Sequence, residues 1–355
     1  ELLLAEVRGF TDVISSGERI LGNNVRSFEK LWSEECSTEE AIGVGNGCDA
    51  IEIGLRALDV GIGDEVITTP LTAFATTLAI ARSGATPVFA DVEPGTCCID
   101  SNSVRRCLSN KTKAILVVHL YGQAADIDSL LEVSNQYGIH LIEDCAQAHL
   151  ATFNNKPVGS HGVFGAWSFY PTKNLGAIGD AGAITTNDKK LAEKARQLRN
   201  YGQIDRYKHV VSGLNSRLDE LQASILIERF QYLKSWTNRR KHIALRYWNE
   251  ISNKFIELLQ QPNNSNAHVN HLFVIRSNSK SRDYLQNHFA SKGIQTLIHY
   301  PILCNDQIGL ESYGNDPKGL LSAIDHSNRC ISLPLNPYLE ESEVDYIIDT
   351  CNSLE

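Results

Sequence analysis

Short apolar runs alternate with helical spacing over the first half of the chain. Four apolar runs of strand length lie at 65–68, 87–91, 114–119 and 140–143. Segments whose apolar residues follow helical spacing lie between them, for example at 76–83 and 126–136. This alternation predicts an α/β fold, in which helices cover both faces of a mainly parallel sheet. Ligands of such sheets bind at the carboxyl ends of the strands.

The pattern changes toward both ends of the chain. Residues 1–32 predict a short amphipathic helix and a turn at 17–22. Helical spacing from Leu218 to about Glu250 predicts a long connecting helix, interrupted near Ser235. A strand at 271–275, a helix at 281–291 and a last helix from about Glu341 predict a smaller α+β unit. We therefore expect two domains, at 1–237 and 238–355.

The stretch from Ser168 to Gly182 separates two apolar runs, at 163–167 and 183–185. Pro171 and three glycines within it disfavour a continuous helix or strand, so we expect a loop between two strands. Lys173 lies in this loop among uncharged neighbours. Burial there would lower its pKa and free the amine for Schiff-base chemistry. For a lone lysine, an exposed surface position is the simpler alternative.

Two further patterns precede Lys173. Glu143 and Asp144 end an apolar strand, where a carboxylate is costly unless it is paired or catalytic. Asp144 either caps a helix or pairs with a cationic ring nitrogen. The glycine-rich turn at 43–48 opens a helix whose free N–H groups could bind a phosphate, although a plain helix cap explains it equally well. This turn lacks the third glycine of the dinucleotide fingerprint, which disfavours a nicotinamide dehydrogenase.

Composition narrows the class of protein. The 355 residues carry a net charge of -9, which argues against a nucleic-acid partner. No apolar run approaches the ~20 residues that span a bilayer, so we expect no membrane partner. The nine cysteines lack Cys-x-x-Cys spacing and predict neither a metal site nor a disulfide framework. A reducing, cytoplasmic location fits them best.

Four motifs stand in a fixed order along the chain. They are Asn46-Gly-Cys-Asp-Ala50, Glu143-Asp-Cys-Ala-Gln-Ala-His149, Ser168-x-x-x-x-Lys173-Asn-Leu-Gly and Asn215-Ser-Arg-Leu-Asp219. In this order they resemble the DegT/DnrJ/EryC1 family of sugar aminotransferases, which depend on pyridoxal 5′-phosphate (PLP). The resemblance implies the PLP-dependent transferase fold of type I. Its large domain has a mainly parallel seven-stranded sheet between helices, and its C-terminal domain is a smaller α+β unit.

The resemblance implies a role for each residue around the cofactor ring. Lys173 would hold PLP as a Schiff base and shuttle a proton during transfer. Asp144 would pair with the pyridinium nitrogen and keep it protonated. Gln147 would approach the ring's O3′. Phe74 is a substitute for the family's stacking aromatic, because Ala73 stands at that position.

The phosphate would be held by the amides of Gly47 and Cys48 and by the Ser168 hydroxyl. Cys48 stands where the family usually has threonine, so a good hydroxyl donor is lost while the backbone amide remains. Asn215 resembles a residue that reaches the phosphate from the neighbouring subunit. The resemblance therefore implies a homodimer with shared active sites.

Four further residues are expected at the substrate, namely Tyr207, Arg217, His299 and Tyr300. Arg217 would hold the substrate's diphosphate. A salt bridge at the start of the following helix, with Asp219 or Glu220, is nearly as good an explanation for this arginine.

The implied reaction is amino transfer from L-glutamate, with pyridoxamine phosphate (PMP) formed during turnover. The acceptor would be a nucleotide-linked (dTDP) 3-keto-6-deoxyhexose, in the biosynthesis of deoxyamino sugars. Amination at C4 is the alternative on the same fold. A PLP-dependent sugar dehydratase, in which histidine replaces the lysine, and a non-catalytic regulator are further alternatives. The presence of Lys173 counts against both.

Overall fold

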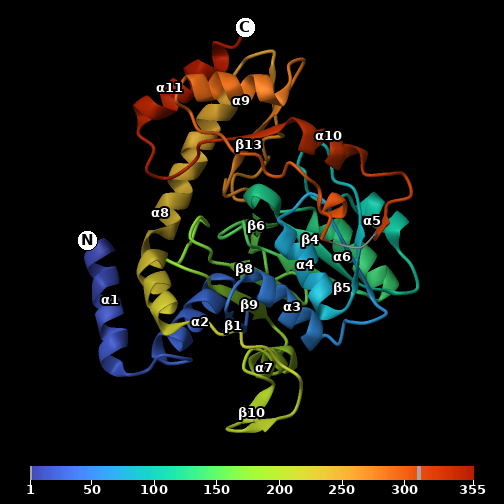
Figure 1. The fold of residues 1–355 in the computed structure, drawn as a ribbon, viewed down its shortest axis with the longest axis vertical. Coiled ribbons are helices and arrows are strands. Elements are labelled where there is room, and N and C mark those ends of the chain that lie inside the picture. Colours follow the sequence, from blue (N-terminus) through green and yellow to red (C-terminus); the bar gives the residue numbers. More distant parts are fainter. Residues whose placement is uncertain (1, 310–312) are drawn as a thin grey trace.

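The computed structural model describes residues 2–309 and 313–355 (Figure 1). Its main sheet contains the strands β1 (Glu40–Val44), β2 (Glu65–Thr68), β3 (Thr86–Phe89), β4 (Thr112–Val118), β5 (His140–Asp144), β8 (Phe164–Ser168), β9 (Gly182–Thr186) and β14 (Gly314–Asn315). Their order is β1-β9-β8-β5-β4-β2-β3-β14. The six strands from β8 to β14 are parallel, whereas β9 is antiparallel to both its neighbours. The predicted mainly parallel sheet is confirmed.

Seven of these strands belong to the large domain, as the resemblance implies. The eighth, β14, is a two-residue strand from the C-terminal part of the chain that pairs with β3 at the sheet edge. Two residues show no periodicity, so no pattern could predict this strand.

Helices cover both faces of the sheet. They are α2 (Asn23–Glu35), α3 (Gly47–Ala57), α4 (Phe74–Ser83), α5 (Ser101–Cys107), α6 (Ile127–Tyr137), α7 (Lys189–Leu198) and α8 (Glu220–Glu250). Strand β4 shows why both faces are apolar. Ala114 and Leu116 pack into one buried cluster with residues of α3, α4 and α7, and Ile115 and Val117 pack into another with residues of α2, α6 and α8.

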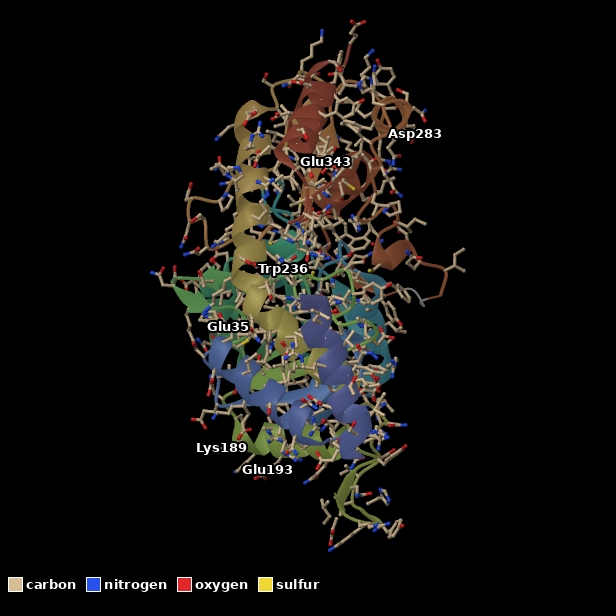
Figure 2. All side chains as sticks on the ribbon, turned by 90° about the vertical axis from the view of Figure 1, so that its left-hand side faces the viewer. Glu35, Lys189, Glu193, Trp236, Asp283 and Glu343 are labelled. Carbon is tan, nitrogen blue, oxygen red and sulfur yellow. The ribbon has the colours of Figure 1, made fainter. Side chains whose placement is uncertain are left out.

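Helix α8 links the two parts of the molecule (Figures 1 and 2). It runs for 31 residues without a break, so the predicted interruption near Ser235 is wrong. The Ser235 hydroxyl donates to the Tyr232 carbonyl (2.7 Å), which satisfies this side chain inside the helix. Helix α1 (Leu2–Ser16) packs beside the N-terminal half of α8, and Trp236 lies near the middle of α8 (Figure 2).

The C-terminal part forms its own layer. Its antiparallel sheet contains β12 (Ile256–Leu258), β13 (Phe273–Ser277) and β15 (Cys330–Leu333), and its helices are α9 (Arg282–Ser291), α10 (Leu321–Arg329) and α11 (Glu341–Asn352). A separate buried cluster joins this sheet to Ile243 and Tyr247 of α8. The predicted boundary at 237/238 lies inside α8, shortly before this cluster, and stays a prediction.

The remaining elements are short. Two hairpins occur, β6 (Thr152–Phe153) with β7 (Lys156–Pro157) and β10 (Gln203–Asp205) with β11 (Lys208–His209), besides 3-10 turns at Leu120–Gly122 and Cys304–Asp306. The β10–β11 hairpin projects from the body beside α7 (Figures 1 and 2). In the part of the chain that the structure describes, no helix combines the length and the apolar character needed to cross a membrane.

Candidate active site

The predicted site residues gather where parallel strands end. Asp144 is the last residue of β5 and pairs with Val118 of β4 and Ala166 of β8. Ser168 is the last residue of β8, and Lys173 follows in the loop that leads to β9. This is the edge of the sheet at which α/β folds bind ligands.

Lys173 and Asp144 influence each other's charge. Burial lowers the pKa of Lys173 to about 8, and the negative charge of Asp144 opposes this shift. Burial also raises the pKa of the Asp144 carboxyl, against two hydrogen bonds and the charge of Lys173. The two bonds come from neutral donors, the amide of Ala146 (3.1 Å) and the hydroxyl of Thr76 (2.8 Å). Asp144 therefore lies in an apolar setting without a cation in direct contact among the described residues, and it does not cap a helix.

Gln147 is held from two sides. Its Oε1 accepts from the amide of Tyr121 (2.6 Å), and its Nε2 donates to the phenol of Tyr300 (3.1 Å). The phenol of Tyr121 donates to the carbonyl of His299 and contacts Nε2 of His326 (2.9 Å). Tyr121 thus ties Gln147 to the segment that carries His299 and Tyr300. Sequence reasoning did not find Tyr121, because its partners lie up to 205 residues away.

The N-terminus of α3 approaches Ser168 closely. The Asn46 side chain caps α3 by accepting from the amide of Asp49 (2.8 Å). The amides of Gly47 and Cys48 have no acceptor inside the helix, because these are its first two residues. A Cβ on Gly47 would lie 2.7 Å from the Ser168 Cβ, so only glycine permits this approach. Two amides and a hydroxyl therefore meet where an anion would be stabilised by the helix.

Cys48 and Phe74 lie on the same side of the site. The Cys48 thiol donates to the carbonyl of Ala75 (3.4 Å), and burial raises its pKa to about 11, so it stays neutral. Phe74 begins α4 with 36% of its surface exposed, which leaves its ring open to a ligand.

His149 closes the loop that carries Lys173. The amide of Leu175 donates to Nδ1 (3.0 Å), so the proton lies on Nε2, which donates to the carbonyl of Ser168 (3.1 Å). Burial lowers the pKa of His149 to about 3, helped by the charge of Lys173, and keeps the ring neutral. One neutral imidazole therefore joins both ends of the loop. The motif contains His149, but its spacing gives no sign of this contact.

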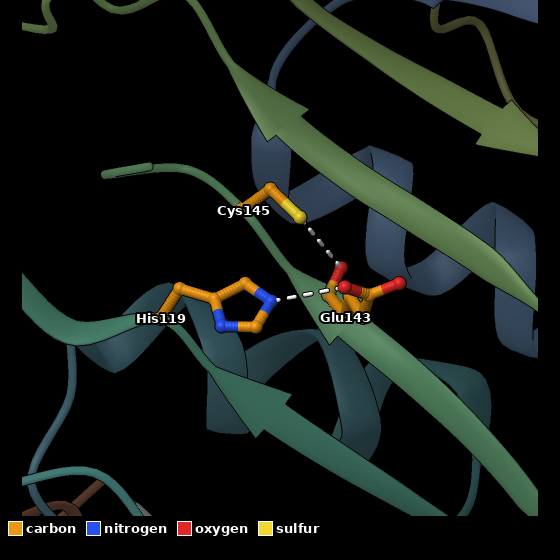
Figure 3. A group of neighbouring side chains, drawn as sticks. All are labelled: His119, Glu143 and Cys145. Atoms are coloured by element: carbon orange, nitrogen blue, oxygen red, sulfur yellow. Dashed lines mark hydrogen bonds and ion pairs between the residues drawn. The ribbon is translucent and has the colours of Figure 1, made fainter. Parts of the chain in front are cut away.

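The second carboxylate of the acidic motif has a structural role (Figure 3). Glu143 is fully buried and accepts from the amides of Gly159, His161 and Gly162 and from Nε2 of His119. Burial opposes its ionised form, but these hydrogen bonds outweigh burial and lower the pKa of the carboxyl.

Cys145 lies close to this pair, and the three side chains together have the composition of a metal site. The second nitrogen of His119, Nδ1, accepts from the amide of Ala125 (3.1 Å). Burial raises the pKa of the Cys145 thiol well above its usual range. His119 and Glu143 are held by hydrogen bonds, and the thiol of Cys145 stays protonated. The geometry therefore favours a structural role of the three side chains over metal binding.

Glu143→Gln should destabilise the protein by about 2 to 4 kcal/mol, because an amide NH₂ must then face backbone donors in a buried site. The melting temperature should fall by several degrees in a thermal scan. Glu132, which is 71% exposed and paired with Arg105, provides the control. Glu132→Gln should melt almost like the wild type. Equal melting of both variants would contradict the proposed role of Glu143.

A cavity of about 730 Å³ lies beside Lys173. Its walls come from α1, the Lys173 loop, α8 and the C-terminal part of the chain, and include Lys173, Asn174, Arg229, Trp236, Arg240, His271, Gln295, His299, Ser332 and Asn336. We call it the donor-side cavity. Its lining includes Lys173 and His299 but none of Gly47, Cys48 or Ser168.

Three predicted residues lie elsewhere on the chain's surface. Tyr207, at the tip of the β10–β11 hairpin, is 80% exposed, and Asn215 is also exposed. Arg217 donates to the side chain of Asn200 (3.0 Å). The alternative salt bridge with Asp219 or Glu220 is wrong, because Arg217 bonds Asn200 instead. The Glu220 carboxylate accepts from the amides of Asn24 and Val25 in the first turn of α2. Among the described residues, none of the three forms a hydrogen bond or ion pair with Lys173, and none lines the donor-side cavity.

A model of the DegT/DnrJ/EryC1/StrS aminotransferase family matches residues 4–352. The chain belongs to this family. It is therefore an aminotransferase, which confirms the resemblance, the enzyme class and the fold of type I.

Two known proteins are similar over almost the whole chain. The "dTDP-3-amino-3,6-dideoxy-alpha-D-galactopyranose transaminase" of Aneurinibacillus thermoaerophilus is 44% identical over 340 residues, which cover 96% of this chain and 92% of that protein. The "pleiotropic regulatory protein" of Geobacillus stearothermophilus is 42% identical over 345 residues, which cover 97% and 92%.

A solved structure of the family has the same fold. It is that of DesV from S. venezuelae, in complex with a ketimine intermediate. The match has a TM-score of 0.95 at 37% identity and covers 100% of this chain and 96% of that one.

Proposed function

We propose that the protein is a PLP-dependent aminotransferase that moves the amino group of L-glutamate to a nucleotide-linked keto sugar. The observation that carries the proposal is the partly buried Lys173, whose lowered pKa frees its amine, near a carboxylate without a cation in direct contact. A lysine for the Schiff base and an aspartate for the ring nitrogen are the pair by which enzymes hold PLP.

The side chains and backbone amides around Lys173 fit this cofactor. Asp144 would accept from the protonated ring nitrogen, which supplies the cation that its apolar setting lacks. The amides of Gly47 and Cys48 and the Ser168 hydroxyl would hold the phosphate at the start of α3. Gln147 would meet the ring's O3′, and the half-exposed Phe74 would cover one face of the ring. When bound, PLP supplies the electron sink that stabilises a carbanion at the reacting carbon.

Lys173 would also move the proton. Its Nζ accepts a proton from the α-carbon of glutamate and later delivers one to the sugar carbon, which its lowered pKa permits near neutral pH. His149 fixes the loop on both sides of Lys173, so the amine stays in place while it exchanges the proton. Tyr121 orients Gln147 and, through it, Tyr300.

The capture of PLP by the apoprotein should depend on the pKa of Lys173. Only the neutral amine attacks the cofactor's aldehyde, so the rate should rise with pH, reach half of its maximum at about pH 8 and then level off. Stopped-flow absorbance of the covalent link measures this rate, with PLP and free Nα-acetyl-lysine as the control for titration of the cofactor. A rate that climbs about tenfold per pH unit up to pH 10 would contradict a lowered pKa.

The acceptor is a dTDP-linked 3-keto-6-deoxyhexose in this proposal. The relative from Aneurinibacillus thermoaerophilus, named for a dTDP-3-amino sugar, supports this choice. Amination at C4 is the alternative, and the presence of Lys173 counts against a dehydratase. A relative is named as a regulatory protein, but the partly buried Lys173 together with the buried Asp144 favours catalysis.

A homodimer with shared sites is part of the proposal. Tyr207 and Asn215 are exposed on their own chain and Arg217 is partly exposed, so all three could reach the phosphate and substrate that a second copy binds. All nine cysteines are free, which supports a reducing, cytoplasmic location.

Mixed dimers test the shared site. When Lys173→Ala chains are co-expressed with Asn215→Ala chains, one site of each heterodimer carries both lesions and the other carries neither. Activity should therefore recover above that of either mutant homodimer, to about half of the wild-type value per dimer. If purified heterodimers show no recovery although Asn215→Ala homodimers are impaired, Asn215 serves the site of its own subunit.

The function itself is tested first by the half-reaction with glutamate. Protein reconstituted with PLP should be yellow, and glutamate should bleach this colour and release 2-oxoglutarate in an amount equal to the sites. A protein that binds PLP but is not converted by glutamate would overturn the proposed donor.

A further inference from the structure

One wall of the donor-side cavity carries a buried arginine without a counter-ion. Arg240, on α8, is 8% exposed. Its Nη1 donates to the carbonyls of Leu335 (2.8 Å) and His271 (3.3 Å). Its buried Nε has no hydrogen-bond partner, and no described carboxylate lies within ion-pair distance. A buried guanidinium that lacks a counter-ion and a hydrogen-bond partner destabilises the protein unless a ligand supplies them.

The other positive groups of the cavity are already engaged. Arg229 forms an ion pair with Glu6 (2.6 Å) and donates to the carbonyl of Gly176 (2.7 Å). Burial lowers the pKa values of His271 and His299, which keeps both rings neutral. Lys173 is assigned to the cofactor. Among the described lining residues, Arg240 is therefore the one cation left for a ligand.

We propose that the donor-side cavity binds the amino donor and that Arg240 holds one of its carboxylates. This inference rests on the proposed function, since it names where glutamate binds next to Lys173. Nη1 is engaged by two carbonyls and Nε is shielded from solvent, so Nη2, which has no hydrogen-bond partner among the described residues, is the nitrogen that can donate to a carboxylate in the cavity.

Charge and size favour an amino acid over the nucleotide sugar at this wall. A diphosphate carries two negative charges, whereas a single uncommitted cation matches one carboxylate. The cavity volume of about 730 Å³ is ample for glutamate. Arg217, which does not line this cavity, is left for the diphosphate.

The test compares Arg240→Gln with Arg239→Gln, a matched change at the preceding arginine of α8, which pairs with Glu341 and does not line the cavity. Binding of glutarate, an unreactive dicarboxylate, is measured by calorimetry on the PLP-loaded enzyme. The single-turnover bleaching of the cofactor is measured with glutamate, with glutamine, which lacks the γ-carboxylate, and with 4-aminobutyrate, which lacks the α-carboxylate.

Arg240→Gln should weaken glutarate binding and slow the reaction with glutamate by about 10- to 100-fold, the range for a hydrogen bond to a charged group. The substitution should not slow the reaction with the donor that lacks the carboxylate bound by Arg240. The donor whose rate is unchanged therefore identifies which carboxylate Arg240 binds. The reaction of the PMP enzyme with the sugar should keep its KM. Arg239→Gln should leave glutarate binding unchanged.

Equal losses with all three donors, or unchanged binding of glutarate, would overturn the inference. If Arg240→Gln fails to fold, Arg240→Lys keeps the charge and should retain part of the glutarate affinity. The wild type provides an independent check, because it should bind glutarate at least about 10-fold more tightly than the neutral glutaramide. Equal affinities would also overturn the inference. A wild type that binds glutarate but is not bleached by glutamate would refute the proposed function instead.

Discussion

Lys173→Ala is expected to abolish covalent attachment of PLP and to lower transamination by at least about 10⁴-fold, as for other essential nucleophiles. The amine does two tasks in the proposal, because it binds the cofactor and moves the proton, and no second described amine lines the donor-side cavity. The fold should persist, since alanine removes a partly buried amine whose charged form the surroundings already disfavour. Borohydride reduction followed by peptide mass spectrometry locates the attachment.

Lys189→Ala is the control for this change, because that side chain is 73% exposed and lies at the start of α7, toward the lower end of the molecule in Figure 2. It should retain full activity and the reduced adduct on Lys173. An adduct on any other lysine of the wild type would refute the assignment.

Asp144→Asn is expected to retain bound PLP but to lower turnover by several orders of magnitude. Asparagine keeps the size of the side chain, but it removes the charge that holds the ring nitrogen protonated, and an unprotonated ring is a poorer electron sink. Stopped-flow bleaching with glutamate separates this chemical step from binding, and absorbance reports the occupancy of the cofactor.

Thr76→Val provides a graded comparison, because it deletes only the hydroxyl that donates to Asp144 (2.8 Å). Its loss should cost about 10-fold, in line with one hydrogen bond to a charged group. Near-normal turnover of Asp144→Asn would show that another group holds the ring nitrogen.

The sequence predicts the site residues whose position is determined by the strand, loop or helix that carries them. Asp144 ends an apolar strand, Lys173 follows the next strand in a glycine-rich loop, and Gly47 opens a helix, so each reaches the carboxyl edge through its own element. Hydrophobic periodicity therefore predicts both the sheet and these positions on it.

The supporting residues depend on contacts between distant segments. Tyr121 meets His326, which lies 205 residues later, and Thr76 meets Asp144 across 68 residues. Arg240 looks like any polar position of a long helix, and only its lack of a carboxylate partner in the folded chain distinguishes it. Spacing along one chain contains no signal for such pairs.

The Ser235 prediction was wrong for a different reason. Serine favours helix ends because its hydroxyl competes for backbone groups, but here the hydroxyl bonds to the Tyr232 carbonyl within the helix. Packing of α8 against α1, α2 and α11 then outweighs the weak local preference.

Transfer of labelled nitrogen tests the central claim most directly. The PLP-loaded enzyme is incubated with ¹⁵N-glutamate and a dTDP-linked 3-keto-6-deoxyhexose, and the products are analysed by mass spectrometry and NMR. The account predicts a dTDP-amino sugar that carries ¹⁵N at C3, together with one 2-oxoglutarate per amino sugar. Release of 2-oxoglutarate without ¹⁵N in any nucleotide sugar, with the 3-keto and 4-keto substrates alike, would contradict it.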